Sequence, residues 1–380
     1  MRAARALYFT YYTALAAVLP YLALYYEHTG LRGSQIGVLA ALMPLMMLIG
    51  APLWAEFGDA TGRYRLVLTA SIGSSIVLAL GLSVASSFLP LALLVALFAF
   101  GIAPVMPLVD HAVLEELGDR SHLYGRQRIW GAYGWGPAAP AIGWLIERHG
   151  IDLMFYVYAA VMSLALLVAR RIPLATRGGG RRFGVGVATM VRDVRWLAFL
   201  FAAFVGGIGL SVSLNFLPLY MRALGADYTL IGLGIAAATV SELPILAFGG
   251  FLLVRLGARR ILIASLLAYA LRMGLYPLIT VPGWILAVQL LHGPTFAAMW
   301  IAGVAYAKRL APPGSGAAAQ GLFTGVAMGL SGFVGGLYGG FTYEWLGPRW
   351  MFALVAALAL GGAALLAFAT RRDADVRDGT

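Results

Sequence analysis

Residues 52–65 read PLWAEFGDATGRYR, and this stretch decides the fold. It ends an apolar segment at 35–57, turns through glycine and charged residues, and leads into a second apolar segment at 66–87. Each segment is about 20 residues long, which is the length that an α-helix needs to cross the hydrocarbon core of a bilayer. The stretch is therefore predicted to be a tight loop between two transmembrane helices.

The same alternation continues through all 380 residues, of which 61% are hydrophobic and 11% charged. A soluble domain carries charge on about a quarter of its residues. The apolar segments lie at 5–26, 35–57, 66–87, 90–116, 127–148, 151–170, 194–222, 228–253, 260–280, 284–307, 317–345 and 348–370. The sequence thus predicts an all-α integral membrane protein with twelve transmembrane helices.

Two pairs of short segments recur at nearly the same separation. The loop DATGRYRL at 59–66 has a counterpart, VRLGARRI, at 254–261, and GWLIE at 143–147 has a counterpart, GFTYE, at 340–344. We interpret them as a tandem duplication that gives two pseudo-symmetric six-helix bundles, an arrangement common in transporters. The predicted domains are a first bundle at 1–170, a cytoplasmic linker rich in Gly and Arg at 171–193, a second bundle at 194–370 and a cytoplasmic tail at 371–380.

The basic residues are unevenly distributed. Most of the 27 Lys and Arg residues fall at the two ends of the chain and in alternate loops, so the formal net charge of +11 lies mainly on one side. By the positive-inside rule, both termini are expected in the cytoplasm, in a bacterial-type inner membrane. The charge predicts contact with anionic lipids at the cytoplasmic face, and nucleic acid is not expected as a partner.

Catalytic and metal-binding patterns are missing from the sequence. The chain has no cysteine, which excludes disulfides, thiol catalysis and Cys-ligated metals. It also has no H-E-x-x-H pattern, no P-loop and no arrangement of a nucleophile with a base. We therefore expect neither an enzyme nor a bound metal or cofactor.

A few ionisable residues lie within or at the inner ends of the apolar segments. Each charge at the centre of a membrane helix costs about 2.5–3.5 kcal/mol, so its presence requires an explanation. We expect these residues to line a water-filled cavity; structural ion pairing, or a position at the membrane rim for the first two, remains an alternative. They are Asp110, Arg128, Glu242, Arg272 and His292.

The loop at 52–65 resembles the motif between the second and third helices of the major facilitator superfamily. The resemblance implies that Asp59, Gly62, Arg63 and Arg65 form a conformational gate motif in an alternating-access cycle. The sequence departs from the motif at Ala55 and Ala60, and its second copy lacks the Asp.

A narrower resemblance lies at 124–135, YGRQRIWGAYGW, which is similar to the entry of the fifth helix in the lactose permease and phenylpropionate permease group. Carried over residue by residue, it implies two overlapping sets. The implied substrate-binding residues are Asp110, Arg128, Trp135, Glu242 and His292. The implied proton-coupling residues are Glu242, Arg272 and His292, while Thr295 stands where the lactose permease has a glutamate.

Together these features predict a secondary active transporter. We expect proton symport of a sugar, glycoside or similar small polar organic solute by alternating access, performed by a monomer. An aromatic-carboxylate or nucleoside permease of the same superfamily remains an alternative, as does an uncoupled facilitator or exchanger. An efflux pump for lipophilic cations is disfavoured, because two arginines are expected in the cavity.

Overall fold

The computed structural model describes residues 1–174, 190 and 192–371, with the side chains of 121 and 122 left aside. These residues form helices joined by short connections, with no strand among them. Ten helical segments are long and apolar enough to cross a membrane, and Leu153–Ala169 is a shorter apolar helix. The prediction of an all-α membrane fold is confirmed, and every predicted apolar segment is helical over most of its length.

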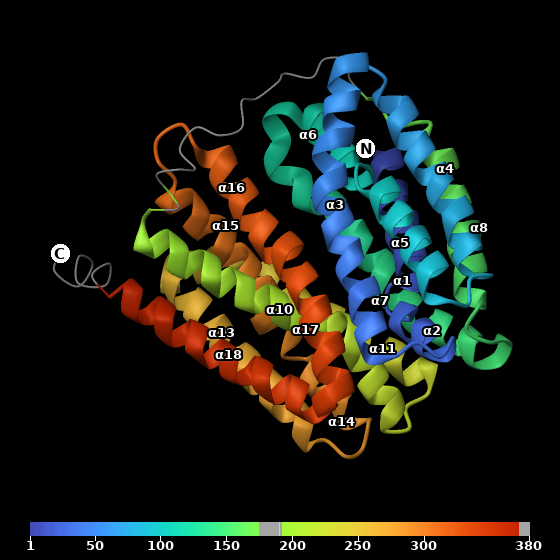
Figure 1. Ribbon diagram of the computed structural model, residues 1–380. Helices are drawn as coiled ribbons and strands as arrows, with labels where there is room; N and C mark the ends of the chain where they lie inside the picture. Colours follow the sequence, from blue (N-terminus) through green and yellow to red (C-terminus); the bar gives the residue numbers. More distant parts are fainter. Residues whose placement is uncertain (175–189, 191, 372–380) are drawn as a thin grey trace. The chain divides into compact units, whose positions relative to one another are not determined.

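The chain divides into two compact units (Figure 1). The first comprises Met1–Gly180 together with Leu217–Ala236, and the second comprises Arg181–Phe216 together with Ala237–Thr380. The predicted domain boundaries stay a prediction. Most of the predicted linker at 171–193 and of the predicted tail at 371–380 lies outside the described residues.

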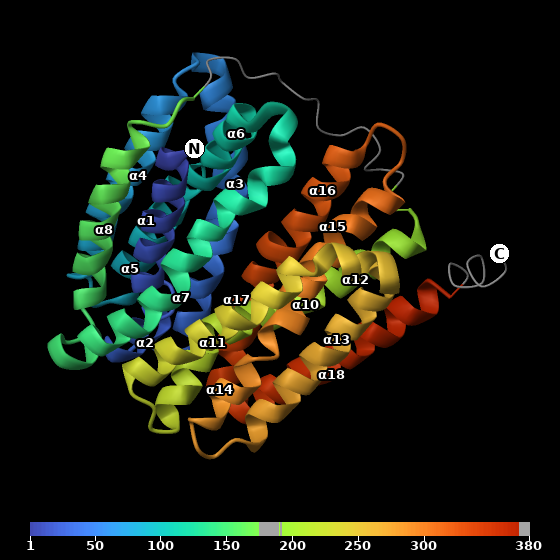
Figure 2. The ribbon, with the colours of Figure 1, turned by 180° about the vertical axis from the view of Figure 1, so that it is seen from behind.

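In the first unit, α1 packs against α7 and α8, α3 packs against α5, and α4 packs against α5 and α8 (Figure 2). Because every backbone polar group in a bilayer must be satisfied within its own segment, helices are the natural choice for these apolar stretches. The elements are α1 (Arg2–Val18), α2 (Leu22–His28), α3 (Gly33–Thr61), α4 (Tyr64–Leu82), α5 (Phe88–Ile102), α6 (Val105–Leu117), the 3-10 helix η1 (Gly118–Leu123), α7 (Tyr124–His149) and α8 (Leu153–Ala169).

In the second half of the chain, α13 packs against both α15 and α18, and α17 packs against α18. The pairs α13 with α18 and α13 with α15 repeat the pairs α4 with α8 and α4 with α5, as expected for a duplication. The elements are α10 (Val194–Ala223), α11 (Tyr228–Ala247), α12 (Gly249–Leu256), α13 (Ala258–Leu275), η2 (Tyr276–Leu278), α14 (Trp284–Gln289), η3 (Gly293–Ala297), α15 (Ala298–Leu310), α16 (Gly316–Thr324), η4 (Gly325–Leu330), α17 (Ser331–Leu346) and α18 (Pro348–Ala369).

An arginine near the start of α4 holds the end of α8. The Arg65 guanidinium donates to the backbone carbonyl oxygens of Arg170 at 3.2 Å and of Ile172 at 3.5 Å. The last carbonyls of a helix have no partner within the helix, and a basic side chain can satisfy them. Arg65 therefore ties the start of α4 to the end of α8.

The second unit repeats this contact. Near the start of α13, Arg259 donates to the Thr370 hydroxyl at 2.6 Å and to the Ala367 carbonyl oxygen at 3.1 Å, at the end of α18. We refer to the Arg65 and Arg259 contacts as the two clasps. They show that the duplication extends from the sequence to side-chain geometry.

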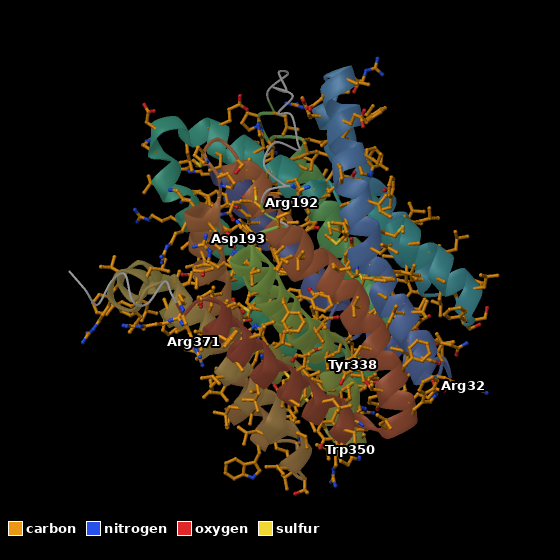
Figure 3. All side chains as sticks on the ribbon, turned by 60° about the vertical axis from the view of Figure 1, so that its left-hand side comes forward. Arg32, Arg192, Asp193, Tyr338, Trp350 and Arg371 are labelled. Atoms are coloured by element: carbon orange, nitrogen blue, oxygen red, sulfur yellow. The ribbon has the colours of Figure 1, made fainter. Side chains whose placement is uncertain are left out.

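The two ends of α18 carry different side chains. Figure 3 shows Trp350 and Arg371 at opposite ends of this helix. Near Trp350, the Tyr338 hydroxyl donates to the Met351 carbonyl oxygen at 3.0 Å, and at the other end the Arg371 guanidinium lies 4.9 Å from the Phe368 ring centroid. Aromatic and basic residues at helix ends are typical of the membrane–water interfaces.

Close packing of α10 against α17 generates the first prediction. A Cβ added at Gly207 would collide with the Ser331 hydroxyl and the Ala327 carbonyl oxygen. We expect Gly207→Ala to destabilise the protein by about 1–3 kcal/mol through overpacking and to lower its Tm in detergent by several degrees. Gly361→Ala in α18, whose Cβ would meet no atom within 4 Å, is the control, and equal Tm values for the two variants would contradict this packing.

Candidate functional site

The predicted site residues form two clusters, one in each unit. In the first unit, Asp110 on α6 and Arg128 on α7 lie together, with 3.9 Å between Arg128 Nε and Asp110 Oδ1. The Tyr8 hydroxyl on α1 donates to the same Asp110 oxygen at 2.5 Å. Both charged side chains keep part of their surface exposed, 35% for Arg128 and 28% for Asp110. This pair is therefore open to a ligand.

Aromatic rings support the Arg128 guanidinium. Its central carbon lies 4.7 Å from the ring centroid of Tyr12 and 5.4 Å from that of Tyr8. The quadrupole of an aromatic ring attracts a cation that lies over its face, and this attraction is stronger where the cation is desolvated. Trp135 is half-buried on α7, seven residues after Arg128, and helical periodicity places it on the same face two turns further along.

The second cluster surrounds Arg272 on α13, of which only 1% is exposed. Its guanidinium donates to the Tyr276 hydroxyl at 2.9 Å, to the Thr295 hydroxyl at 3.2 Å and to the side-chain oxygen of Gln289. All three acceptors are neutral. Among the described residues, no carboxylate lies within ion-pair distance of Arg272.

His292 links Arg272 to Glu242. Arg272 lies 2.9 Å from Nδ1 of His292, and Nε2 of the same ring lies 3.1 Å from Glu242 Oε1. A guanidinium only donates, so Nδ1 must accept and the ring proton must sit on Nε2, where it faces the carboxylate. The contact with Arg272 therefore fixes one neutral tautomer of His292, whose Nε2–H points at Glu242.

A close backbone approach holds Glu242 in place. The Gly293 amide donates to the Ser241 hydroxyl at 2.9 Å, and a Cβ at Gly293 would collide with the Ser241 carbonyl oxygen. Gly293 begins a π-helical turn, η3, which runs to Ala297. Such turns insert one residue into a helix and re-aim its side chains, and they are frequent at functional sites.

Thr295 belongs to this cluster although it carries no charge. It is fully buried, and its hydroxyl accepts from Arg272 and donates to the His292 carbonyl oxygen at 2.8 Å. Thr295 is thus a neutral partner of the buried arginine.

The predicted gate motif lies at the connection between α3 and α4. Gly62 ends α3 in the left-handed conformation, with φ of 64°, and the Tyr64 hydroxyl donates to the Asp59 carboxylate. Arg65 forms the first clasp, whereas Arg63 is exposed and its backbone amide bonds the Thr61 hydroxyl. Within the first unit, the motif therefore acts as a structural tie.

Several residues of the two clusters were not predicted. Tyr8 and Tyr12 face the first pair, while Gln289, Tyr276 and Ser241 complete the second cluster. The available signal was weak: a tyrosine-rich run at 8–12 and a lone Gln three residues before His292, both inside apolar segments. Neutral polar side chains cost less in a membrane than charges, so they attract less attention in a sequence.

Comparison with known proteins identifies relatives over nearly the whole chain. The profile of the MFS_1 like family matches residues 2–354. A maltose permease of Geobacillus stearothermophilus is 27% identical over 352 residues, covering 92% of this chain and 88% of that protein. A probable 3-phenylpropionic acid transporter of Escherichia coli (strain K12) is 25% identical over 369 residues, covering 93% and 94% of the two chains.

Solved structures share the fold at low sequence identity. The crystal structure of a mutant form of the nucleoside transporter NupG matches with a TM-score of 0.87 at 17% identity, covering 97% of this chain and 99% of that chain. A mutant form of a peptide transporter POT matches with a TM-score of 0.75 at 12% identity, covering 97% and 93%.

The buried arginine gives the second prediction. Gln289→Leu removes an acceptor from a charge that water cannot reach. We therefore expect the free energy of unfolding to fall by about 1.5–3 kcal/mol and the Tm in detergent to fall with it. The double variant Arg272→Leu/Gln289→Leu removes the charge along with its acceptor. Its loss of unfolding free energy should therefore be smaller than the sum of the losses in the two single variants.

The control for this prediction is Gln320→Leu, since Gln320 bonds a backbone carbonyl at 2.8 Å and no charged group. A Tm for Gln289→Leu that equals the Tm of this control would show that Gln289 does not hold the Arg272 charge.

Proposed function

The chain belongs to the MFS_1 like family, and from this membership we propose that it is a proton symporter for a sugar, glycoside or similar small polar organic solute. At the coarser level it is a multi-pass integral membrane transporter of the major facilitator superfamily and not an enzyme. The observation that carries the proposal is the contact of Glu242 with a His292 ring whose other nitrogen is occupied by Arg272.

We assign solute binding to Asp110, Arg128 and Trp135. A guanidinium offers a rigid fork of donors and a carboxylate offers paired acceptors, so neighbouring hydroxyls of a sugar can bridge the two with charge-assisted bonds. An indole provides a flat face for the apolar side of a sugar ring. The partial exposure of the ion pair and the similarity to a maltose permease support this assignment.

We assign proton coupling to Glu242, with His292 and Arg272 as its positioning partners. In this scheme Glu242 is protonated on one side of the membrane and releases the proton on the other. His292 stays neutral, because protonation at Nδ1 would set its new N–H against the Arg272 guanidinium. His292 and Glu242 are also proposed to contact the solute, so that its arrival alters the environment of the carboxylate.

The proposed cycle is alternating access by a monomer, with Asp59, Gly62, Arg63 and Arg65 as the gate motif. We assign both termini to the cytoplasm of a bacterial cell; the basic residues at the two clasps and at the chain ends support this assignment.

A second candidate is a permease for an aromatic carboxylate. Two observations favour it: the similarity to a probable 3-phenylpropionic acid transporter, and an arginine whose described partners are neutral groups and the His292 ring. A thermal-shift screen of the purified protein against sugars, nucleosides and aromatic carboxylates at two pH values separates the candidates.

The third prediction concerns the solute. Arg128→Lys keeps the charge and removes the planar fork, so we expect it to weaken binding of the stabilising solute by about tenfold or more. Arg126→Lys, two residues away and exposed, should bind as the wild type does. The solute-induced shift in Tm measures the affinity of each variant for the solute. Equal losses of affinity in Arg128→Lys and Arg126→Lys would refute the assignment of Arg128.

The fourth prediction concerns the proton. In Glu242→Gln the side chain can no longer take up a proton. We therefore expect accumulation of solute against a gradient to be abolished, whereas exchange of labelled for unlabelled solute persists.

Alkalinisation of the medium, measured when solute is added to energy-depleted cells, should accompany uptake in the wild type and vanish in Glu242→Gln. Glu115→Gln, which changes an exposed carboxylate, is the control. Unchanged alkalinisation in Glu242→Gln would refute the role of Glu242, and no alkalinisation by the wild type would identify an uncoupled facilitator.

A further inference from the structure

A groove outside the proposed transport site lies between α1 and α7 in the first unit. It has a volume of about 450 Å³ and is lined by Arg2, Arg5, Ala6, Phe9, Thr10 and Trp130. This volume falls within the range of about 300–1,000 Å³ found for small-molecule sites. Figure 2 shows α1 and α7 side by side, in agreement with their extensive packing.

The groove lies on the opposite side of α7 from the Asp110 and Arg128 pair. Trp130 follows Arg128 by two residues, which corresponds to about 200° around a helix. On α1, Phe9 is 40% exposed, and Trp130 on α7 is 37% exposed. Large exposed apolar side chains on a transmembrane helix are suited to contact with lipid chains rather than with a polar solute.

One end of the groove carries positive charge. Arg5 is oriented by Gln127, a buried side chain that accepts from Arg5 Nε at 2.7 Å, so the two terminal amino groups of the guanidinium remain for a ligand. Arg2 lies one turn earlier on the same helix. Among the described residues no carboxylate lines the groove, and the nearby Glu116 is engaged by the amino group of Met1 at 2.5 Å.

The other end of the groove is apolar. Ala6, Phe9 and Trp130 form its wall, and the indole packs edge-on against Tyr133 with 5.9 Å between ring centroids. The Thr10 hydroxyl donates to the Ala6 carbonyl oxygen at 2.8 Å, so its hydrogen is not available to a ligand. The groove thus combines two guanidiniums with an aromatic wall, and α1 belongs to a helical segment, Arg2–His28, that is long and apolar enough to cross a membrane.

We propose that this groove binds an anionic phospholipid of the leaflet in which the N-terminus of α1 lies. The lipid phosphate accepts from Arg2 and Arg5, and the upper part of an acyl chain lies along Phe9 and Trp130. Guanidiniums bind phosphate through paired charge-assisted bonds, and tryptophan is enriched at the level of the headgroups. A free phosphate ion would fill only a small part of the groove and would leave its apolar wall without a partner.

The test is native mass spectrometry of delipidated protein titrated with phosphatidylglycerol, with phosphatidylcholine and with inorganic phosphate. We expect phosphatidylglycerol to bind about tenfold more tightly than phosphatidylcholine, because each arginine near a membrane surface favours an anionic lipid. Equal binding of the two lipids overturns the proposal. Binding of inorganic phosphate as tight as that of phosphatidylglycerol would also overturn it, since the groove would then be a site for the free ion.

Two pairs of substitutions localise the effect. Arg2→Gln/Arg5→Gln should weaken phosphatidylglycerol binding by about tenfold. The control, Arg255→Gln/Arg260→Gln, removes the same charge from two exposed arginines of the second unit and should leave binding unchanged. Equal losses in the two double variants would show non-specific charge attraction and refute the groove.

If Arg2→Gln/Arg5→Gln does not fold, Arg2→Lys/Arg5→Lys replaces it, because this variant keeps the basic end of α1. It should weaken phosphatidylglycerol binding by about threefold through loss of the guanidinium fork. Binding equal to that of the wild type would overturn the assignment of these two arginines.

Discussion

A bilayer interior supplies no water to a buried polar group, and this constraint governs the molecule from its helices to its clusters. It explains why the described connections between helices are short and why helix ends are closed by side chains such as Arg65 and Arg259. The same constraint acts most strongly on Arg272, which is almost fully buried and depends on acceptors from η2, α14 and η3. The buried charge thereby fixes the positions of the groups around it.

The two clusters differ in how they satisfy this constraint. The Asp110 and Arg128 pair keeps part of its surface exposed and rests on tyrosine rings, so it can exchange a contact within the protein for one to a ligand. In the second cluster Arg272 is closed off from solvent, while Glu242 at its edge keeps 23% of its side chain exposed. The buried arginine thus holds the network in place, and the exposed carboxylate is the part of it that can meet a proton or a ligand.

Much of the fold follows from the sequence, because length and hydropathy alone identify apolar segments of about 20 residues. The pairing of Asp110 with Arg128 was also predictable, since charges in a membrane must find partners. The contact of Glu242 with His292 was not, because the balance of two acids and two arginines pointed to Arg272 as the partner of Glu242. The tautomer of His292 was not predictable, because it depends on a 2.9 Å contact with a residue 20 positions away. The π-helical turn at Gly293 likewise depends on how closely α11 approaches.

The clasps have a mechanical consequence. Each joins the start of one helix, α4 or α13, to the end of another, α8 or α18, and so ties that end of the helix pair by side-chain bonds as well as by packing. A tie of this kind resists sliding of one helix along the other, so it holds the spacing of the pair constant at that end. In each unit this stiffness comes from a single arginine.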